Sequence, residues 1–350
     1  MAAFELEFGI EIEILLEPSA DSFKDILSQL EASRPNIDKH RIFREGLASL
    51  LEDGGIPARA DARKEFDEWT VVEETTIKEK EGYWRCELVS RVLSTTGDWQ
   101  KEIDDVFTIL ENNCNIETSK GCSMHVHVSP KDDSWEKWQL KSLFKAALYF
   151  DKPMTRIMPK LRKDNEWAKS NVQKIPGGPS MVSSVPQQTW KPLFSRVDGC
   201  RMAQHIMIEL CPDRYVSWNF RNLAGGGSGT VEFRRPPGVK TSLESRHWIA
   251  FTLAYVMHVL FQKDWEAVEL TNSYPTTTDL RNAINGGTDL LGQASRNALF
   301  PAFMEDVTEL AVLASPAERY TINQQKALKS TKRSIFVEKF ESRPNTPSGF

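Results

Sequence analysis

The sequence predicts an α+β protein, because strand-like and helix-like segments are mixed along the chain without an internal repeat. Of its 350 residues, 40% are hydrophobic and 10% aromatic, so one large domain can bury a substantial core. We expect a single domain over residues 1–330. The polar and basic residues 331–350 are expected to form a loosely ordered tail.

The chain begins with a strand, since residues 4–16 alternate between apolar and polar side chains. Two helices are expected next, over residues 21–33 and 39–52, and each is ended by a proline or by glycines. The polar residues 53–68 predict a loop.

The middle of the chain contains further strands and helices. Residues 68–77 and 83–93 are strand-like and flank the turn KEKEG, and residues 98–112 are helical. The segment HVHV predicts another strand. It is followed by a helix over residues 134–150 that breaks near Pro153.

Residues 163–200 are rich in Pro, Ser, Gly and Gln, and we assign them as a lid or substrate loop. Two strands then flank the loop AGGGSG, and a strong helix follows. The expected ranges are 214–222 and 230–235 for the strands and 242–261 for the helix.

Charge and hydropathy exclude two classes of partner. The formal net charge is only −5 and no long run of Lys or Arg occurs, so neither a nucleic acid nor an anionic membrane surface is an expected partner. The longest apolar run, residues 248–261, is interrupted by His258 and is too short to cross a bilayer. Small molecules or peptides are the expected partners.

A cytoplasmic location is expected. The amino terminus carries no signal-peptide pattern, and Ala2 stands where myristoylation needs a glycine. The five cysteines are odd in number and form no CxxC pair, which fits a reducing compartment.

The first strand, ELEFGIEIEI, gathers like charges on one face. Its isoleucines point one way, while Glu11 and Glu13 point the other way. Two unit charges about 6 Å apart repel by about 3 kcal/mol at an effective dielectric constant of 20. A divalent cation would turn this repulsion into attraction.

The same alternation gives three other segments a polar face. A lone histidine or a lone Glu-x-Arg strand is more often structural, but four such strands are harder to explain in that way. If the strands are neighbours in one sheet, they line a polar concavity. Its expected members are Glu11, Glu13, Glu87, His125, His127, Glu232 and Arg234, with Ser129 on the same face as the histidines.

The residue types select the metal. Mainly carboxylate ligands with a single histidine suit Mg²⁺ or Mn²⁺, whereas closed zinc sites favour Cys and His. Such ions can clamp the phosphates of a nucleotide, with an arginine balancing the charge of the transferred group. The segment AGGGSGT lacks the GK[ST] ending of a P-loop, so an ATP site here would use metals and arginines.

Five motifs together resemble the amidoligase family, a branch of the carboxylate-amine ligases that share the glutamine synthetase catalytic sheet. They are FGIEIE, ELVS, GCSMHVHVSP, RYVSWNF and TVEFRRP, in that order, between residue 8 and about residue 239. The resemblance implies a curved, mainly antiparallel sheet of glutamine synthetase-like type with helices packed on one side.

The resemblance also implies roles for individual residues. Metal-binding positions correspond to Glu11, Glu13, Glu87, His125 and Glu232. Nucleotide-binding positions correspond to His127, Ser129, Arg221 and Arg234, of which Arg234, together with Glu232, is also a catalytic candidate. Substrate-binding candidates are Arg162, Arg214 and Asn219. WTVVEETTI departs from the family pattern Trp-x-x-x-x-Asp-x-Ser, and Glu74 could replace that Asp as an amine-binding or proton-accepting residue.

The implied activity is ATP- and Mg²⁺-dependent formation of an amide or isopeptide bond through an acyl phosphate, on an amino acid or small peptide. One alternative is a metal-dependent hydrolase or oxygenase that uses His-x-His to bind zinc or iron. Further ligands for it are not apparent, because His205, His247 and His258 lie outside the strand motifs. The other alternative is a catalytically inactive binding protein on a ligase fold.

Overall fold

The computed structural model describes the chain from Phe4 to Leu299, with gaps. The described ranges are 4–34, 36–61, 66–131, 134–163, 165–172, 189–201, 214–261 and 263–299, together with Met207 and Cys211. They lie within one compact unit, Met1–Asp306. The expected tail, 331–350, lies outside the described residues, as do residues 173–188 of the expected lid, and the prediction of one domain over 1–330 stays a prediction.

A nine-stranded sheet forms the centre of the described chain, with the order β2-β3-β4-β1-β7-β9-β8, and β5 and β6 also pair with β1. Every pairing is antiparallel except that of β2 with β3. The strands are β1 (Leu6–Pro18), β2 (Ala58–Ala60), β3 (Trp69–Glu73), β4 (Trp84–Val89), β5 (Leu93–Ser94), β6 (Cys114–Glu117), β7 (Met124–Pro130), β8 (Trp218–Asn219) and β9 (Val231–Phe233). The expected mixed class with a mainly antiparallel sheet is confirmed, and its glutamine synthetase-like type stays a prediction.

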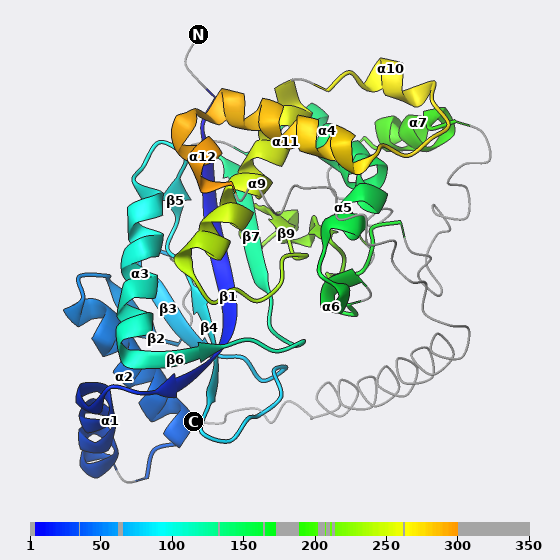
Figure 1. Cartoon of the computed structure of the whole chain (residues 1–350). Coiled ribbons are helices and arrows are strands. Elements are labelled where there is room, and N and C mark those ends of the chain that lie inside the picture. Colours follow the sequence, from blue (N-terminus) through cyan, green and yellow to red (C-terminus); the bar gives the residue numbers. More distant parts are fainter. Residues whose placement is uncertain are drawn as a thin grey trace, which may run out of the picture. The chain divides into compact units, whose positions relative to one another are not determined.

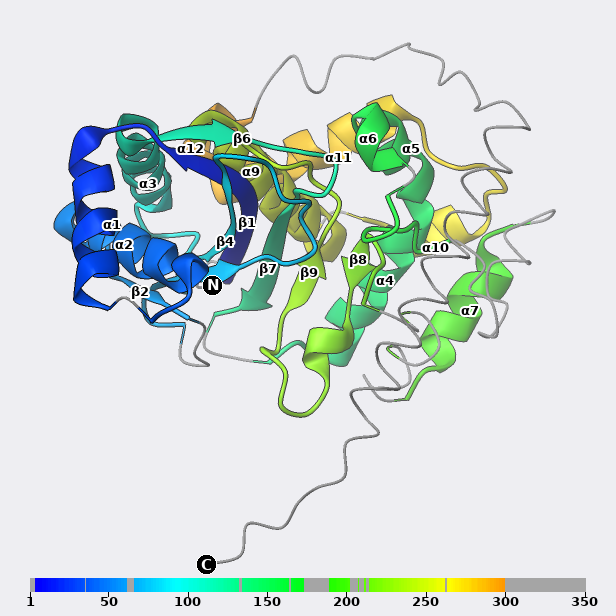
Figure 2. The same ribbon diagram turned by 90° about the horizontal axis from the view of Figure 1, so that it is seen from below.

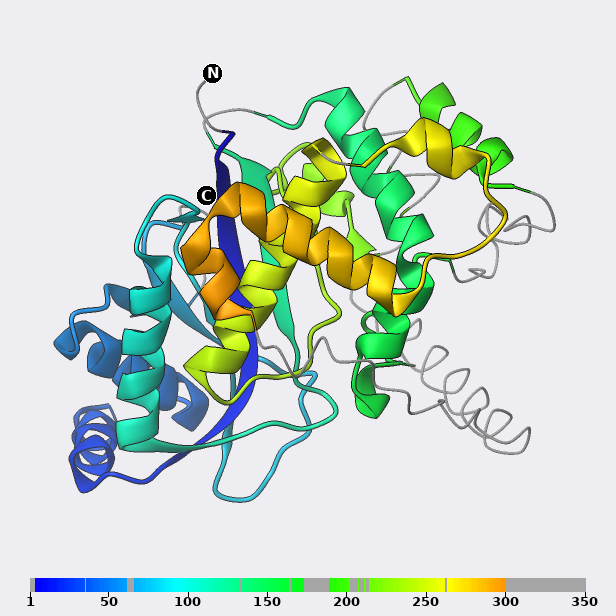
Figure 3. The ribbon, with the colours of Figure 1, turned by 45° about the horizontal axis from the view of Figure 1, so that its top comes forward.

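Helices α3, α9, α11 and α12 lie on the same side of β1 and β7 (Figures 1 and 3). The helices are α1 (Asp21–Ser33), α2 (Lys39–Asp53), α3 (Trp99–Asn113), α4 (Lys137–Tyr149), α5 (Asp151–Ile157), α6 (Lys160–Lys163), α7 (Lys191–Gly199), α9 (Ser242–Phe261), α10 (Trp265–Glu269), α11 (Thr277–Leu291) and α12 (Gln293–Ala298), with a 3₁₀ turn, η2 (Arg221–Leu223). No helix in the described ranges is long and apolar enough to cross a membrane.

The core lies between these helices and the apolar face of the sheet. Ile10, Ile12 and Ile14 of β1 are at most 1% exposed. Helix α9 is apolar on nearly all sides because it packs between β7 and α11. Gly287 of α11 permits the close approach to α9, since a Cβ atom there would lie 1.8 Å from the carbonyl oxygen of Ala254. The opposite face of β1 carries Glu11 and Glu13.

The helices expected at 21–33 and 242–261 are confirmed with the same bounds. The helix expected from residue 134 begins only at Lys137, because Glu136 forms a capping box with Gln139. The break expected near Pro153 lies instead at Phe150. Pro153 occupies the first turn of α5, where its missing N–H group has no helical partner to lose.

Three further expectations need correction. The loop expected at 53–68 contains β2, a short edge strand, and the irregular stretch at 163–200 contains α7. The strand expected at 214–222 is limited to β8. Its continuation is replaced by η2, since the side-chain oxygen of Asn219 accepts a hydrogen bond from the Arg221 N–H at 2.9 Å and turns the chain.

Candidate active site

The strands that carry the polar motifs are neighbours. In Figure 2, β4, β1, β7 and β9 lie side by side, in the order that the pairing gives. The register places Glu13 opposite Glu87, Glu11 opposite His125, and His127 opposite Glu232. The expectation that these strands are neighbours in one sheet is confirmed.

Carboxylates and imidazoles from these strands form three overlapping groups that could hold metal ions. In each group, the candidate ligand atoms lie within 4.8 Å of one another. The groups are Glu11, His127 and Glu232; Glu11, Glu87 and His125; and Glu13, Glu74 and Glu87. His127, expected to contact nucleotide, and Glu74, expected to bind the amine or accept a proton, therefore also lie among the candidate metal ligands.

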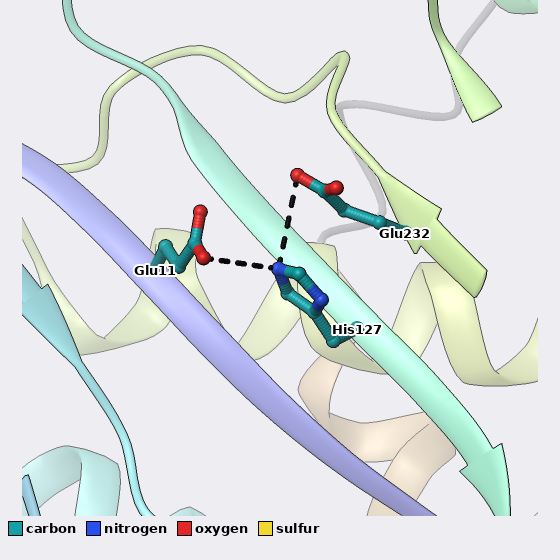
Figure 4. A group of neighbouring side chains, drawn as sticks. All are labelled: Glu11, His127 and Glu232. Carbon is teal, nitrogen blue, oxygen red and sulfur yellow. Dashed lines mark ion pairs between the residues drawn. The ribbon is translucent and has the colours of Figure 1, made fainter. Parts of the chain in front are cut away.

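In the first group, the carboxylates of Glu11 and Glu232 both lie near one nitrogen of the His127 ring (Figure 4). Its Nε2 atom lies 3.2 Å from Glu11 Oε1 and 3.7 Å from Glu232 Oε1, and forms no hydrogen bond in the described structure. Burial lowers the pKa of His127, but the charges of Glu232 and Glu11 outweigh it and raise the pKa above its ordinary value. Its Nδ1 atom lies 3.0 Å from Thr230 Oγ1, so a metal-binding Nε2 would have an oriented ring.

The second group contains His125, which is 2% exposed. Its Nδ1 atom lies 2.7 Å from Glu11 Oε2, to which it donates, and its Nε2 atom lies 3.0 Å from Ser123 Oγ. The Ser123 hydroxyl donates to Glu13 Oε2 at 2.6 Å. Ser123 therefore connects the histidine with the third group.

The third group holds only carboxylates. Burial, followed by the charges of Glu11, Glu13 and Glu74, raises the pKa of Glu87 well above its ordinary value. Burial also raises the pKa of Glu13. Glu74 lies just beyond β3, where its Oε1 atom accepts a hydrogen bond from the Thr76 N–H at 2.7 Å.

These residues fit a hard divalent cation. Their donor atoms are mainly carboxylate oxygens, the kind that Mg²⁺ and Mn²⁺ prefer. Burial is the first cause of the raised pKa values of Glu13 and Glu87, and for Glu87 the neighbouring carboxylates Glu11, Glu13 and Glu74 add to it.

Arg234 lies beside this cluster and forms an ion pair with Glu232 Oε1. The other carboxylate oxygen of Glu232 accepts hydrogen bonds from Asn219 at 2.7 Å and from Asn222 at 3.0 Å. Asn219, 1% exposed, therefore holds Glu232 in place, and its expected contact with substrate stays a prediction.

The model of a family described as "Putative amidoligase enzyme" matches residues 5–256, more than half of the chain. The chain belongs to this family. The family name indicates an enzyme of the ligase type. No curated protein matches the chain.

The remaining expected site residues differ in their surroundings. Arg162 is buried, and its guanidinium donates to the main-chain carbonyls of Arg234 and Arg235. Arg214 is exposed and lies over the ring of Tyr215. Arg221 is also exposed, in η2. Substrate or nucleotide contacts of these three arginines stay predictions.

A cleft of about 200 Å³ opens beside the first candidate metal group. Its polar lining includes Glu7, His127 and Ser129, and Phe66 and Val92 form part of its apolar wall. Gly9 lies on the polar face of β1, opposite His127, and leaves room there. A Cβ atom at Gly9 would only touch Ser90 Oγ at 3.7 Å, so close packing does not require glycine at this position.

Several residues of the site were not predicted from the sequence, among them Ser123, Thr230, Asn222 and Phe66. The alternation could have found the first two, since Ser123 precedes His125, and Thr230 precedes Glu232, by two positions on the same strand face. Nothing local identifies the other two. Asn222 reaches the site from η2, and Phe66 is exposed in a left-handed backbone conformation with φ 45°.

Proposed function

We propose that this protein is an ATP-dependent carboxylate-amine ligase, forming an amide or isopeptide bond through an acyl phosphate. The observation that carries the proposal is the meeting of three candidate metal groups, a paired arginine and a cleft on one face of the sheet. Small-molecule or peptide carboxylates and amines are the proposed substrates.

Mg²⁺ or Mn²⁺ would be held by Glu11, Glu13, Glu87, His125 and Glu232, and His127 and Glu74 are added as ligand candidates by the geometry. When bound, the ions would neutralise the phosphates of ATP and the repulsion among the carboxylates.

The cleft suggests the direction in which ATP lies. It opens at the Ser129 end of β7, whereas Arg234 follows the end of β9 on the side of His125 and Glu13. If the adenine ring of ATP packs against Phe66, the phosphates extend past His127 toward Arg234. This order fits transfer of the terminal phosphoryl group, whose charge an arginine can stabilise.

The chemistry then uses residues at the Arg234 end. A substrate carboxylate oxygen attacks the γ-phosphorus, the bond to the β-phosphate oxygen breaks, and ADP leaves. The amine nitrogen next attacks the acyl carbon, its proton passes to a base, and phosphate leaves. Glu74 is the candidate base, and Arg234 paired with Glu232 is the candidate group for charge stabilisation.

The nucleotide product tests this proposal. Incubation with ATP, Mg²⁺ and mixed amino acids and peptides should yield ADP, together with condensation products detectable by mass spectrometry. Without the amine, ADP should form much more slowly. AMP as the stoichiometric product would contradict the acyl-phosphate route, and stoichiometric zinc or iron in the purified protein would favour the hydrolase or oxygenase alternative.

The proposed position of the adenine ring predicts that Phe66→Ala weakens the binding of ATP selectively. Because stacking of a base on an aromatic ring contributes about 1–3 kcal/mol, KM for ATP should rise by the equivalent factor. Binding of inorganic tripolyphosphate with Mg²⁺, measured by calorimetry, should not change. Leu270→Ala, which removes another exposed apolar side chain, serves as the control. If KM for ATP and the affinity for ATP are unchanged in Phe66→Ala, the adenine ring binds elsewhere.

A further inference from the structure

Arg162 contacts the main chain just after the end of strand β9. Strand β9 ends at Phe233 and is followed by Arg234, Arg235 and two prolines. Prolines have no N–H group to donate to a neighbouring strand. Main-chain pairing nevertheless continues beyond them, since the Pro236 carbonyl accepts from the Met124 N–H at 3.5 Å and the Gly238 N–H donates to the Cys122 carbonyl at 3.2 Å. Arg162 donates from Nη2 to the carbonyl oxygen of Arg234 at 2.6 Å and from Nε to that of Arg235 at 3.1 Å.

The burial of Arg162 makes these two bonds important. Its side chain is 2% exposed, and burial lowers its pKa to about 10, so it is still charged at neutral pH. A buried charge is tolerated only where hydrogen bonds or opposite charges compensate for lost water. Here two main-chain carbonyls supply the hydrogen bonds, with the negative charge of Glu13 nearby.

The two arginines after β9 have separate partners. Arg235 is 1% exposed, its Nη1 atom lies 3.6 Å from Asp151 Oδ1, and its Nη2 atom donates to the Lys163 carbonyl at 3.4 Å. Arg234 instead pairs with Glu232, and its N–H donates to the Ser217 carbonyl at 2.9 Å. The peptide between them therefore determines where the Arg234 side chain starts. Arg162 holds the carbonyl of this peptide, from Arg234, and the carbonyl of the next one, from Arg235.

We propose that Arg162 is a positioning residue: its fork of two hydrogen bonds fixes the main chain at residues 234–235 and thereby aims the Arg234 guanidinium at Glu232 and the carboxylate cluster. This inference rests on the proposed function for the catalytic role of Arg234. In this proposal, Arg162 acts through Arg234 and does not contact the substrate directly.

Arg162→Lys tests the inference kinetically, because an ammonium group lacks the planar fork of guanidinium. A misplacement of about 1 Å can cost about 100-fold, so kcat should fall by roughly that factor while KM for ATP and for the carboxylate stays nearly constant. Arg156→Lys, at an exposed position of α5, is the matched control and should behave as wild type. A raised KM for the carboxylate with unchanged kcat would instead make Arg162 a substrate contact and overturn the proposal.

A double variant separates positioning from general damage. If Arg162 acts through Arg234, adding Arg162→Lys to Arg234→Gln should lower kcat no further. A further loss equal to that of the single variant would overturn the proposal. Arg162→Gln, whose shorter side chain carries one donor nitrogen in place of the guanidinium fork, replaces the lysine variant if the latter does not fold. If neither variant folds, the residue is structural and the proposal is rejected.

A second measurement does not depend on ligase activity. Phenylglyoxal modification of Arg234, followed by peptide mass spectrometry, should be several-fold faster in Arg162→Lys than in wild type or Arg156→Lys. Faster modification in a protein that never forms ADP would leave the positioning role intact and refute the proposed function. Unchanged modification and unchanged kcat in an enzyme that does form ADP would refute the positioning role alone.

Discussion

Replacement of Glu13 by glutamine should abolish ATP turnover while leaving the metal-free protein as stable as wild type, or more stable. Glu13 is 7% exposed and belongs to the all-carboxylate metal group. Removing a residue that hydrogen-bonds to a metal ligand typically lowers metal affinity or activity by about 10- to 100-fold, and removing a direct ligand should lower it more. The expected loss of turnover therefore exceeds about 100-fold.

The sign of the stability effect follows from the raised pKa of Glu13, caused first by burial. A carboxyl group with a raised folded-state pKa favours folding below its unfolded value and loses that contribution as pH rises through the folded-state value. The advantage of Glu13→Gln should therefore be largest at neutral or alkaline pH and vanish in acid. Thermal unfolding with EDTA, across pH 4–8, measures this difference.

Glu45→Gln is the matched control for Glu13→Gln. Glu45 is a half-buried carboxylate of α2 that pairs with Arg34 and Arg41. Its replacement removes favourable pairs, so it should lower stability slightly at neutral pH without affecting turnover. Mg²⁺ should raise the unfolding temperature of wild type and Glu45→Gln more than that of Glu13→Gln. Normal turnover in Glu13→Gln would reject the metal cluster.

The polar face of the site could be predicted because alternation along a strand is a local property. Glu11 and Glu13 share a face whatever the strand pairs with, and the same holds for His125 and His127. Strand order and register are not local. The prediction could propose that the strands meet, but only the pairing brings His127 opposite Glu232.

Roles were harder to predict than positions. Asn219 lies in a motif beside the catalytic strand, and nothing in the sequence indicates that its amide faces Glu232 rather than a substrate. The partners of Arg162 are equally hidden, since main-chain carbonyls about 70 residues later in the chain leave no side-chain signature. Contacts between distant segments depend on packing, which one local pattern cannot reveal.

The short strands β6 and β2 were not predicted, because local sequence does not determine them. Strand β6 starts directly at Cys114, where α3 ends, without a glycine or proline between them. Strand β2 has only three residues and lies at the sheet edge. Their strand conformation comes from pairing with β1 and β3 rather than from local propensity.

His125→Ala should lower turnover far more than His247→Ala, although both variants should lose stability. His125 is 2% exposed and contacts Glu11 and Ser123 within the site. His247 is 1% exposed in α9 and packs against Trp248 and Phe251. The two variants thus remove the same ring from equally buried positions, and only the first removes a candidate metal ligand. Parallel measurements of ADP formation and thermal unfolding check this difference.

The stability of the control variant, His247→Ala, should also depend on pH differently from that of wild type. Burial lowers the pKa of His247 to about 4, from an ordinary value of 6.5. Such a group supports folding above its unfolded value, and its contribution, about 3 kcal/mol, is lost as pH falls from about 6.5 toward 4. His247→Ala should therefore lose less stability than wild type across this pH range. If both variants lose activity in proportion to stability, His125 is a packing residue like His247, and the metal site must be built without it.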